Sequence, residues 1–328
     1  MTRALFPGLV LLTAALVLVS LLTGPAGFGP GESLSALLTG QGEAVTLVMR
    51  EIRLPRALLA VLVGASLGLS GAALQGYLRN PLAEPGLIGV SGSAALGAVI
   101  ALQTGAAAAF GLALPLMALA GAVVAVLLIL LLAGPRGGSL TLILAGIAIS
   151  ALAGALTSLA LNLSPNPFAT AEIVFWMMGS LADRSLTHVW LAAPFMALGW
   201  ALLLPLGRGL DALTLGEDAA AALGVRLARL RLRLVLGVAA CVGAATAVAG
   251  AIGFVGLVVP HLLRPLVGAR PSVLLPASAL GGAAMVLLAD IAVRLVLPER
   301  DLKLGVLMAI VGAPLFLHLI FKTRRAAA

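Results

Sequence analysis

The few residues of this chain that could do chemistry are spaced in a way that excludes ATP hydrolysis by a Walker A loop. Such a loop needs Gly-Lys-Ser/Thr, because backbone amides and a lysine must hold the phosphates. Neither of the two lysines, Lys303 and Lys322, stands in that context. We therefore expect no catalytic residue in this chain, and any ATP and magnesium would be bound by a partner.

The metal-ligating residue types are also sparse. The three histidines, His188, His261 and His318, lie in different apolar stretches without metal-ligand spacing. The single cysteine, Cys241, excludes an intramolecular disulfide or a thiolate cluster and is expected to be a small core residue. The sequence thus predicts no metal site and no cofactor bound by this chain.

Asp290 and Arg294 form the one ionisable pair well inside an apolar stretch. Their i, i+4 spacing with the acid first favours an ion pair on a helix. Carriers driven by an ion gradient usually need ionisable side chains at membrane depth. The pair is read first as mutually neutralising, and the dearth of other buried charges argues against such a carrier.

The elements that must position these residues are membrane-spanning helices. The chain is 62% hydrophobic and 10% charged, with a mean hydropathy of +1.18, so it has too little polar surface for a water-soluble globule. Its apolar runs are long enough to cross about 30 Å of hydrocarbon as helices. We predict an all-α polytopic membrane protein forming a single transmembrane domain over residues 1–328. About ten spans are expected, at 5–23, 57–78, 86–106, 109–133, 140–162, 187–206, 234–252, 254–267, 274–297 and 304–321.

Two of these spans have an alternative interpretation. The first resembles a signal peptide in its charged start and apolar stretch, but an uncleaved span is the simpler interpretation. The eighth is short and contains Pro260, so we expect a kinked or partly re-entrant element.

Orientation follows from the basic residues, which are enriched in cytoplasmic loops. With the N-terminus inside, thirteen of the twenty Lys and Arg residues are cytoplasmic, and both chain termini are too. This predicts that the net charge of +8 reflects topology, with the lipid bilayer as partner and no nucleic acid. The seven on the outer side are Arg50, Arg53, Arg56, Arg184, Arg294, Arg300 and Lys303.

The longest internal cytoplasmic segment, residues 207–233, is expected to carry a short helix outside the membrane. Thr214 and Glu217 have the spacing of a capping box, and Gly224 is placed to end the helix. Four arginines follow within eight residues, at positions 226, 229, 231 and 233. A rigid protrusion of this kind could receive force from a soluble motor, whereas the arginines alone are typical of side chains that reach lipid phosphates.

The second span is rich in small residues, including Gly64, Gly68 and Gly71. Such residues permit close helix packing or line a path, and packing is the simpler interpretation. Gln75 is a polar group at membrane depth and needs a partner or a water-filled path. These four residues are our candidates for a translocation path.

A shift of 179 residues relates the second span to the seventh. It places Gly64, Gly71, Pro81 and Gly89 on Gly243, Gly250, Pro260 and Gly268. The two spans cross in opposite directions, so the pattern predicts an inverted repeat, unless chance matches in a glycine-rich chain explain it.

Three stretches resemble the FecCD-like (BtuC-type) permeases, the ABC importer subunits for ferric siderophores, haem and cobalamin. They are RLPRALLAVLVGASLGLSGAALQGYLRNPLAEPGLIGVSGS at 53–93, GFVGLVVPHLLRPLVGARP at 253–271 and LGVLMAIVGAPLFLHLI at 304–320. The resemblance implies the BtuC-like fold in a homodimer, with two ATPase subunits below and a periplasmic binding protein above, in the bacterial inner membrane. It departs from the family after His261, where Gly268, Ala269, Arg270 and Pro271 replace a common acidic and basic pair.

The resemblance also implies roles for particular residues. Arg53, Arg56 and Arg294 are similar to outer arginines that meet acidic residues of the binding protein. Alternatively, Asp290 occupies Arg294, and Arg53 offsets Glu51. The segment similar to the family's ATPase-coupling element contains Leu215, Gly216, Glu217, Asp218, Ala219, Leu223 and Gly224.

The sequence therefore predicts an ATP-driven importer permease for a ferric chelate, haem or cobalamin. A secondary transporter driven by an ion gradient is the main alternative, and a purely structural membrane scaffold is the third.

Overall fold

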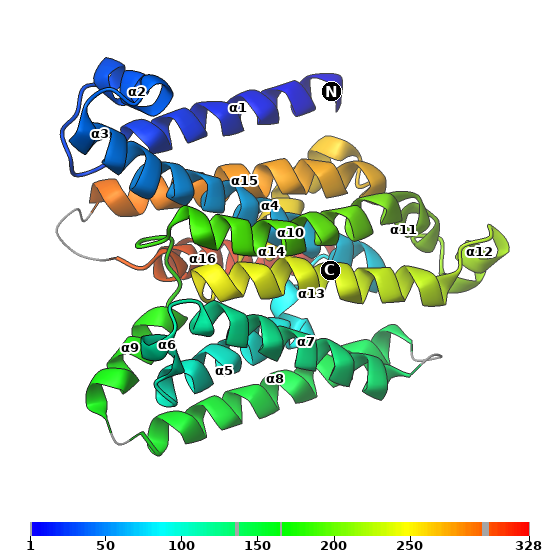
Figure 1. The fold of residues 1–328 in the computed structure, drawn as a ribbon. Helices are drawn as coiled ribbons and strands as arrows, with labels where there is room; N and C mark the ends of the chain where they lie inside the picture. The colour runs from blue at the N-terminus through cyan, green and yellow to red at the C-terminus, as the bar shows by residue number, and fades with distance from the viewer. Residues whose placement is uncertain (1, 135–137, 165, 297–301, 328) are drawn as a thin grey trace.

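The computed structural model describes residues 2–134, 138–164, 166–296 and 302–327, and throughout these ranges the regular structure is helical. The helices run roughly side by side along one direction (Figure 1). Seven stretches are long and apolar enough to cross a membrane. They comprise α1 (Thr2–Leu22); α3 (Glu43–Leu47), η1 (Val48–Arg53) and α4 (Leu54–Leu78) in series; α7 (Ala113–Ala133); α8 (Ser139–Asn162); α10 (Leu186–Leu203), η3 (Leu204–Leu206) and α11 (Gly207–Leu213) in series; α13 (Leu227–Ala249); and α15 (Pro271–Val296).

Three shorter apolar helices complete the correspondence with the ten predicted spans. They are α5 (Val90–Gln103), which follows η2 (Pro85–Ile88); α14 (Val255–Leu263), which continues into η4 (Arg264–Val267); and the apolar part, Leu304–His318, of α16 (Leu304–Ala327). The ninth predicted span ended at residue 297, which lies outside the described residues. The prediction of an all-helical membrane protein is confirmed.

The short α14 agrees in length with the expectation for the eighth span. Its nine residues rise about 14 Å at 1.5 Å per residue, roughly half the hydrocarbon thickness. Pro260 lies inside it, and Phe254 before it adopts a φ of 67°. The α-helical part is therefore shorter than a full crossing, and a kinked or partly re-entrant path stays a prediction.

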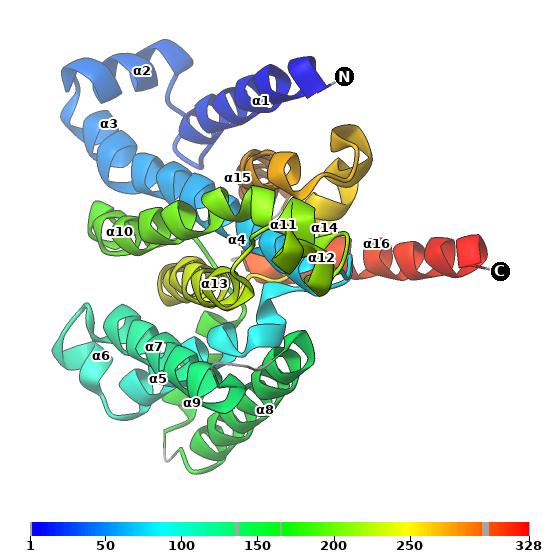
Figure 2. The ribbon, with the colours of Figure 1, turned by 90° about the vertical axis from the view of Figure 1, so that its right-hand side faces the viewer.

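Helix α4 occupies the centre of the fold and packs against α15, α13, α14 and α10 (Figure 2). Its close approach to α15 depends on glycine. A side-chain carbon on Gly64 would overlap the backbone of Gly282, and one on Gly68 would overlap that of Ser278. Lipid supplies no hydrophobic force between helices, so such backbone contact contributes much of the packing.

Among the described residues, three helical segments outside the predicted spans were not anticipated, and one of them is the stretch α3–η1 that precedes α4. Helix α2 (Pro30–Thr39) follows α1, and α9 (Pro167–Met177) follows α8. A signal for α9 was present, because Asn166 caps it through a 2.9 Å hydrogen bond accepted from the Phe168 amide, with Pro167 in the first turn. Neither α2 nor α9 was predicted, because each is too short to be recognised as an apolar span.

The predicted repeat agrees with several local features. The shift of 179 residues carries the first two thirds of α4 onto α13, with the rest falling on the turn and the start of α14, and it carries η2 onto η4 residue for residue. Gly89 and Gly268, which end these two turns, both have positive φ, at 81° and 63°. The inverted repeat stays a prediction.

Candidate functional sites at the two ends of the bundle

A short helix projects from one end of the bundle. Helix α12 (Glu217–Ala222) extends past the neighbouring ends of α11 and α13 (Figure 1). The predicted protruding helix is therefore present in the expected segment, whereas the predicted capping box is wrong. Gly216 is the residue before the helix, with a φ of 108°, and the Thr214 hydroxyl donates back to the Asp211 carbonyl at 2.7 Å. Thr214 is thus the C-cap residue of α11, and Gly216 is the N-cap residue of α12.

The other end of α12 follows the sequence prediction. Gly224 adopts a φ of 85°, the left-handed region that glycine enters without strain. The Val225 amide donates to the Ala220 carbonyl at 3.0 Å, and the Gly224 amide donates to the Ala221 carbonyl at 2.9 Å. This pair of bonds is the Schellman arrangement that ends a helix firmly.

The projecting tip presents apolar side chains to its surroundings. Leu215 and Leu223 are 70% and 66% exposed, whereas Ala220 between them is buried. The base of the tip is tied to the bundle, since Asp211 on α11 accepts a 2.9 Å hydrogen bond from the Ser272 amide at the start of α15. An apolar tip on an anchored base can transmit movement between a partner and the central helices.

At the opposite end, Arg53 is placed inside the protein. Its side chain is only 3% exposed and donates to the carbonyls of Leu21 at 3.0 Å, Leu22 at 3.3 Å and Ala26 at 2.8 Å. These carbonyls lie at or just beyond the end of α1, where helix groups lack partners of their own. Arg53 therefore completes the end of α1, and it has no free surface to add to an external patch.

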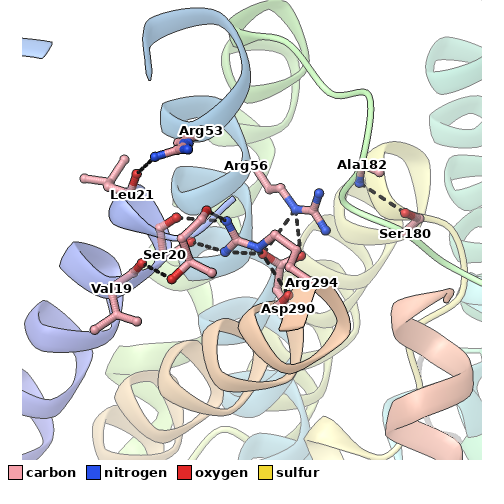
Figure 3. Close-up of polar contacts among 10 residues, drawn as sticks. Val19, Ser20, Leu21, Arg53, Arg56, Ser180, Ala182, Asp290 and Arg294 are labelled. Carbon is pink, nitrogen blue, oxygen red and sulfur yellow. Dashed lines mark hydrogen bonds and ion pairs between the residues drawn. The ribbon is translucent and has the colours of Figure 1, made fainter. Parts of the chain in front are cut away.

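Asp290 joins Arg56 and Arg294 in a buried cluster (Figure 3). Its carboxylate accepts from Arg56 Nε at 2.8 Å and from Arg294 Nη2 at 2.9 Å. The side chain of Asp290 is 1% exposed, against 8% for Arg294 and 17% for Arg56. The alternative in which Asp290 occupies Arg294 is confirmed, and Arg56 is a further partner that spacing could not reveal.

Arg294 is held by α1 as well. It donates to the carbonyls of Ser20 at 2.9 Å and Thr23 at 2.8 Å and to the Ser20 hydroxyl at 2.6 Å (Figure 3). The cluster therefore connects α1, α4 and α15. The three arginines do gather at one end of the bundle, but as internal connections and not as an exposed basic patch. Arg300, expected on the same side, lies outside the described residues.

The proposed path residues Gly64, Gly68 and Gly71 pack against backbone. Gly71 would overlap the backbone of Gly256 in α14 if it carried a side chain, as the other two would overlap α15. The structure thus assigns all three to helix contact, because a residue pressed against a neighbouring backbone cannot line an open path.

Gln75 is buried and has partners in the α14 region. Its amide nitrogen donates to the carbonyls of Gly256 at 3.2 Å and Leu257 at 3.4 Å. Its amide oxygen accepts from Arg264 Nη2 at 2.6 Å. The polar group that needed a partner therefore has one, and it connects α4 to α14.

Comparison with known proteins covers almost the whole chain. The profile of the FecCD transport family matches residues 11–322. The vitamin B12 import system permease proteins BtuC of Salmonella paratyphi A and Salmonella typhi are each 41% identical over 318 residues, covering 97% of this chain and 94% of theirs.

Two solved structures are similar in fold. One is described as a metal-chelate type ABC transporter in an inward-facing conformation, with a TM-score of 0.86 and 35% identity over 98% of this chain and 100% of that chain. The other, PsaBC from Streptococcus pneumoniae in complex with Fab, has a TM-score of 0.54 at 15% identity over 88% of this chain and 94% of that chain, and it shares the fold alone.

Proposed function

Since this chain belongs to the FecCD transport family, we propose that it is the membrane-spanning permease subunit of an ATP-driven importer whose cargo is cobalamin or a related metal chelate. The observation that carries the proposal is the 41% identity to vitamin B12 permeases along 97% of the chain. A ferric siderophore and haem are the other chelates to test. The comparisons give no support to a carrier driven by an ion gradient.

The permease would perform no covalent chemistry itself, and ATP would be hydrolysed by two partner subunits. The exposed Leu215 and Leu223 on α12 support a role in contacting such a partner, because an apolar tip outside the bundle needs a cover. The bond from Asp211 to the Ser272 amide would pass movement of the tip to α15. Glu217, Asp218 and Ala219 lie on the same short helix and would complete the contact.

The remaining partners follow from the family. We propose a homodimer in the bacterial inner membrane, with the translocation path between the two copies and the α12 end facing the cytoplasm. The tight packing of Gly64, Gly68 and Gly71 inside one subunit supports a path outside the α4 core.

A substrate-binding protein would dock at the end that carries Asp290. Of the three arginines proposed for this contact, Arg56 retains the most exposure, whereas Arg53 and Arg294 are better described as internal supports. Arg56→Gln should slow docking and reduce its salt dependence, because rim charges act mainly on association rate. Stopped-flow measurement at low and high salt, with Arg50→Gln as the matched control, would decide this. Equal rates for both variants and the wild type would remove Arg56 from the contact.

The proposed function is tested by reconstitution in vesicles with the cognate ATPase and binding protein. We expect ATP-dependent uptake of labelled cobalamin, with ferric siderophore and haem as parallel substrates. Uptake that persists without ATPase and collapses with the proton gradient would refute the ABC mechanism. ATP-dependent uptake of another chelate alone would correct the cargo.

A further inference from the structure

A cavity of about 300 Å³ lies beside the start of α13, and three arginines line it. Arg229 and Arg233 are spaced i, i+4 on α13, which places them on one face of the helix, and Arg226 is the residue immediately before its first turn. Part of the remaining wall is apolar, with Leu206 and Leu230 among the lining residues. None of the described residues that line this cavity is acidic, and the charged ones are the three arginines.

The three guanidinium groups are free to bind a ligand. Within the described ranges, Arg226, Arg229 and Arg233 form no side-chain hydrogen bond or ion pair, in contrast to Arg231 on the same helix, which donates to the Gly134 carbonyl at 3.0 Å. Three adjacent cations without counter-charge repel each other, and an anion between them would relieve that repulsion.

The position of the cavity along α13 indicates which anion it meets. The 23 residues of α13 are about 34 Å long, slightly more than the hydrocarbon thickness, so its first two turns lie near the membrane boundary. The exposed side chains change from Arg229 and Arg233 to Leu236 along the second and third turns, with the exposed Leu232 between the two arginines. That change is typical of a surface that meets a lipid headgroup first and its acyl chains next.

We infer that this cavity, which we call the α13 arginine pocket, binds the phosphate of an anionic phospholipid. The pocket lies at the joint between α12 and α13, since Gly224 and Val225 also line it. A bound lipid would therefore brace the base of the projecting tip against the membrane. This inference does not depend on the identity of the transported cargo.

Native mass spectrometry of the purified permease tests the inference. The protein would be titrated with phosphatidylglycerol and, in parallel, with phosphatidylcholine. We expect preferential retention of phosphatidylglycerol by the wild type. Arg229→Gln should weaken binding about fivefold, the equivalent of about 1 kcal/mol for one basic side chain near a membrane surface. The triple variant R226Q/R229Q/R233Q should weaken it about 100-fold.

Arg208→Gln is the matched control, because Arg208 is an exposed arginine on α11 that does not line the pocket. It should bind lipid like the wild type. Equal losses in R208Q and R229Q would overturn the inference by showing a general surface effect. Displacement of the lipid by millimolar inorganic phosphate would assign the pocket to free phosphate. Unchanged lipid binding in the triple variant, with loss of ATPase capture, would assign it to a protein contact instead.

Discussion

Removing the charge of Asp290 should destabilise the protein more than any single substitution on its surface. In Asp290→Asn the two arginines that contact the carboxylate, at 2.8 and 2.9 Å, would keep their positive charges in a site with little access to water. Breaking a buried pair by removing one partner typically costs about 3 to 5 kcal/mol, because the other charge is left uncompensated. Two arginines are left here, although Arg294 keeps its bonds to Ser20 and Thr23.

The expected loss is therefore about 3 to 5 kcal/mol, which is a fall in melting temperature of roughly 5 to 10 °C for a chain of this size. Thermal unfolding in detergent, followed by tryptophan fluorescence, measures it. The double variant Arg56→Gln/Asp290→Asn should recover part of the loss, since one unpaired cation is removed with the anion. A melting temperature for Asp290→Asn within about 1 °C of the wild type, or no recovery in the double variant, would refute this account of the cluster.

Three further predictions concern other parts of the molecule. Leu223→Asp should uncouple ATP hydrolysis from uptake while membrane insertion stays intact. Leu38→Asp changes a similarly exposed leucine at the opposite end of the bundle and should leave coupling unchanged. Normal coupling in Leu223→Asp would contradict a partner contact at α12. Gly71→Ala should cost about 1 to 3 kcal/mol of stability by overlap with Gly256. Gly76→Ala on the same helix is the control, because its new methyl group would meet only ordinary contacts. Equal unfolding curves for the two variants would exclude tight packing at Gly71. Crosslinking in lipid nanodiscs should show a dimer, and an obligate monomer there would exclude the homodimer.

Much of the fold was predictable because it depends on residues that are close together in the sequence. Each predicted span coincides with a helix, since an apolar run of sufficient length has few other stable states in a membrane. Gly224 ends α12 because the left-handed conformation needed there strains every residue with a side chain. The short helices α2 and α9 were missed, since neither has the length on which the span prediction depends.

The candidate sites were less predictable, because their partners are far apart in the chain. Glycines spaced along α4 were compatible with a path or with packing, and the structure shows that they pack against backbone carbonyls of α15 and α14. The predicted capping box was wrong because the Thr214 hydroxyl donates to the Asp211 carbonyl at the end of α11 and not to an amide of α12.

The sequence by itself determined that this chain is a multi-pass helical membrane protein of a recognisable transport family. Composition, apolar length and local motifs are properties of consecutive residues, and they need no knowledge of neighbours in space. Only the tertiary structure decided what the charged groups do. Arg53 is an outer-loop arginine by position, yet it is buried because the end of α1 and the turn after it, 27 to 32 residues earlier, offer it three carbonyls. Asp290 pairs with Arg56 across 234 residues, a contact that exists only because α4 and α15 pack side by side.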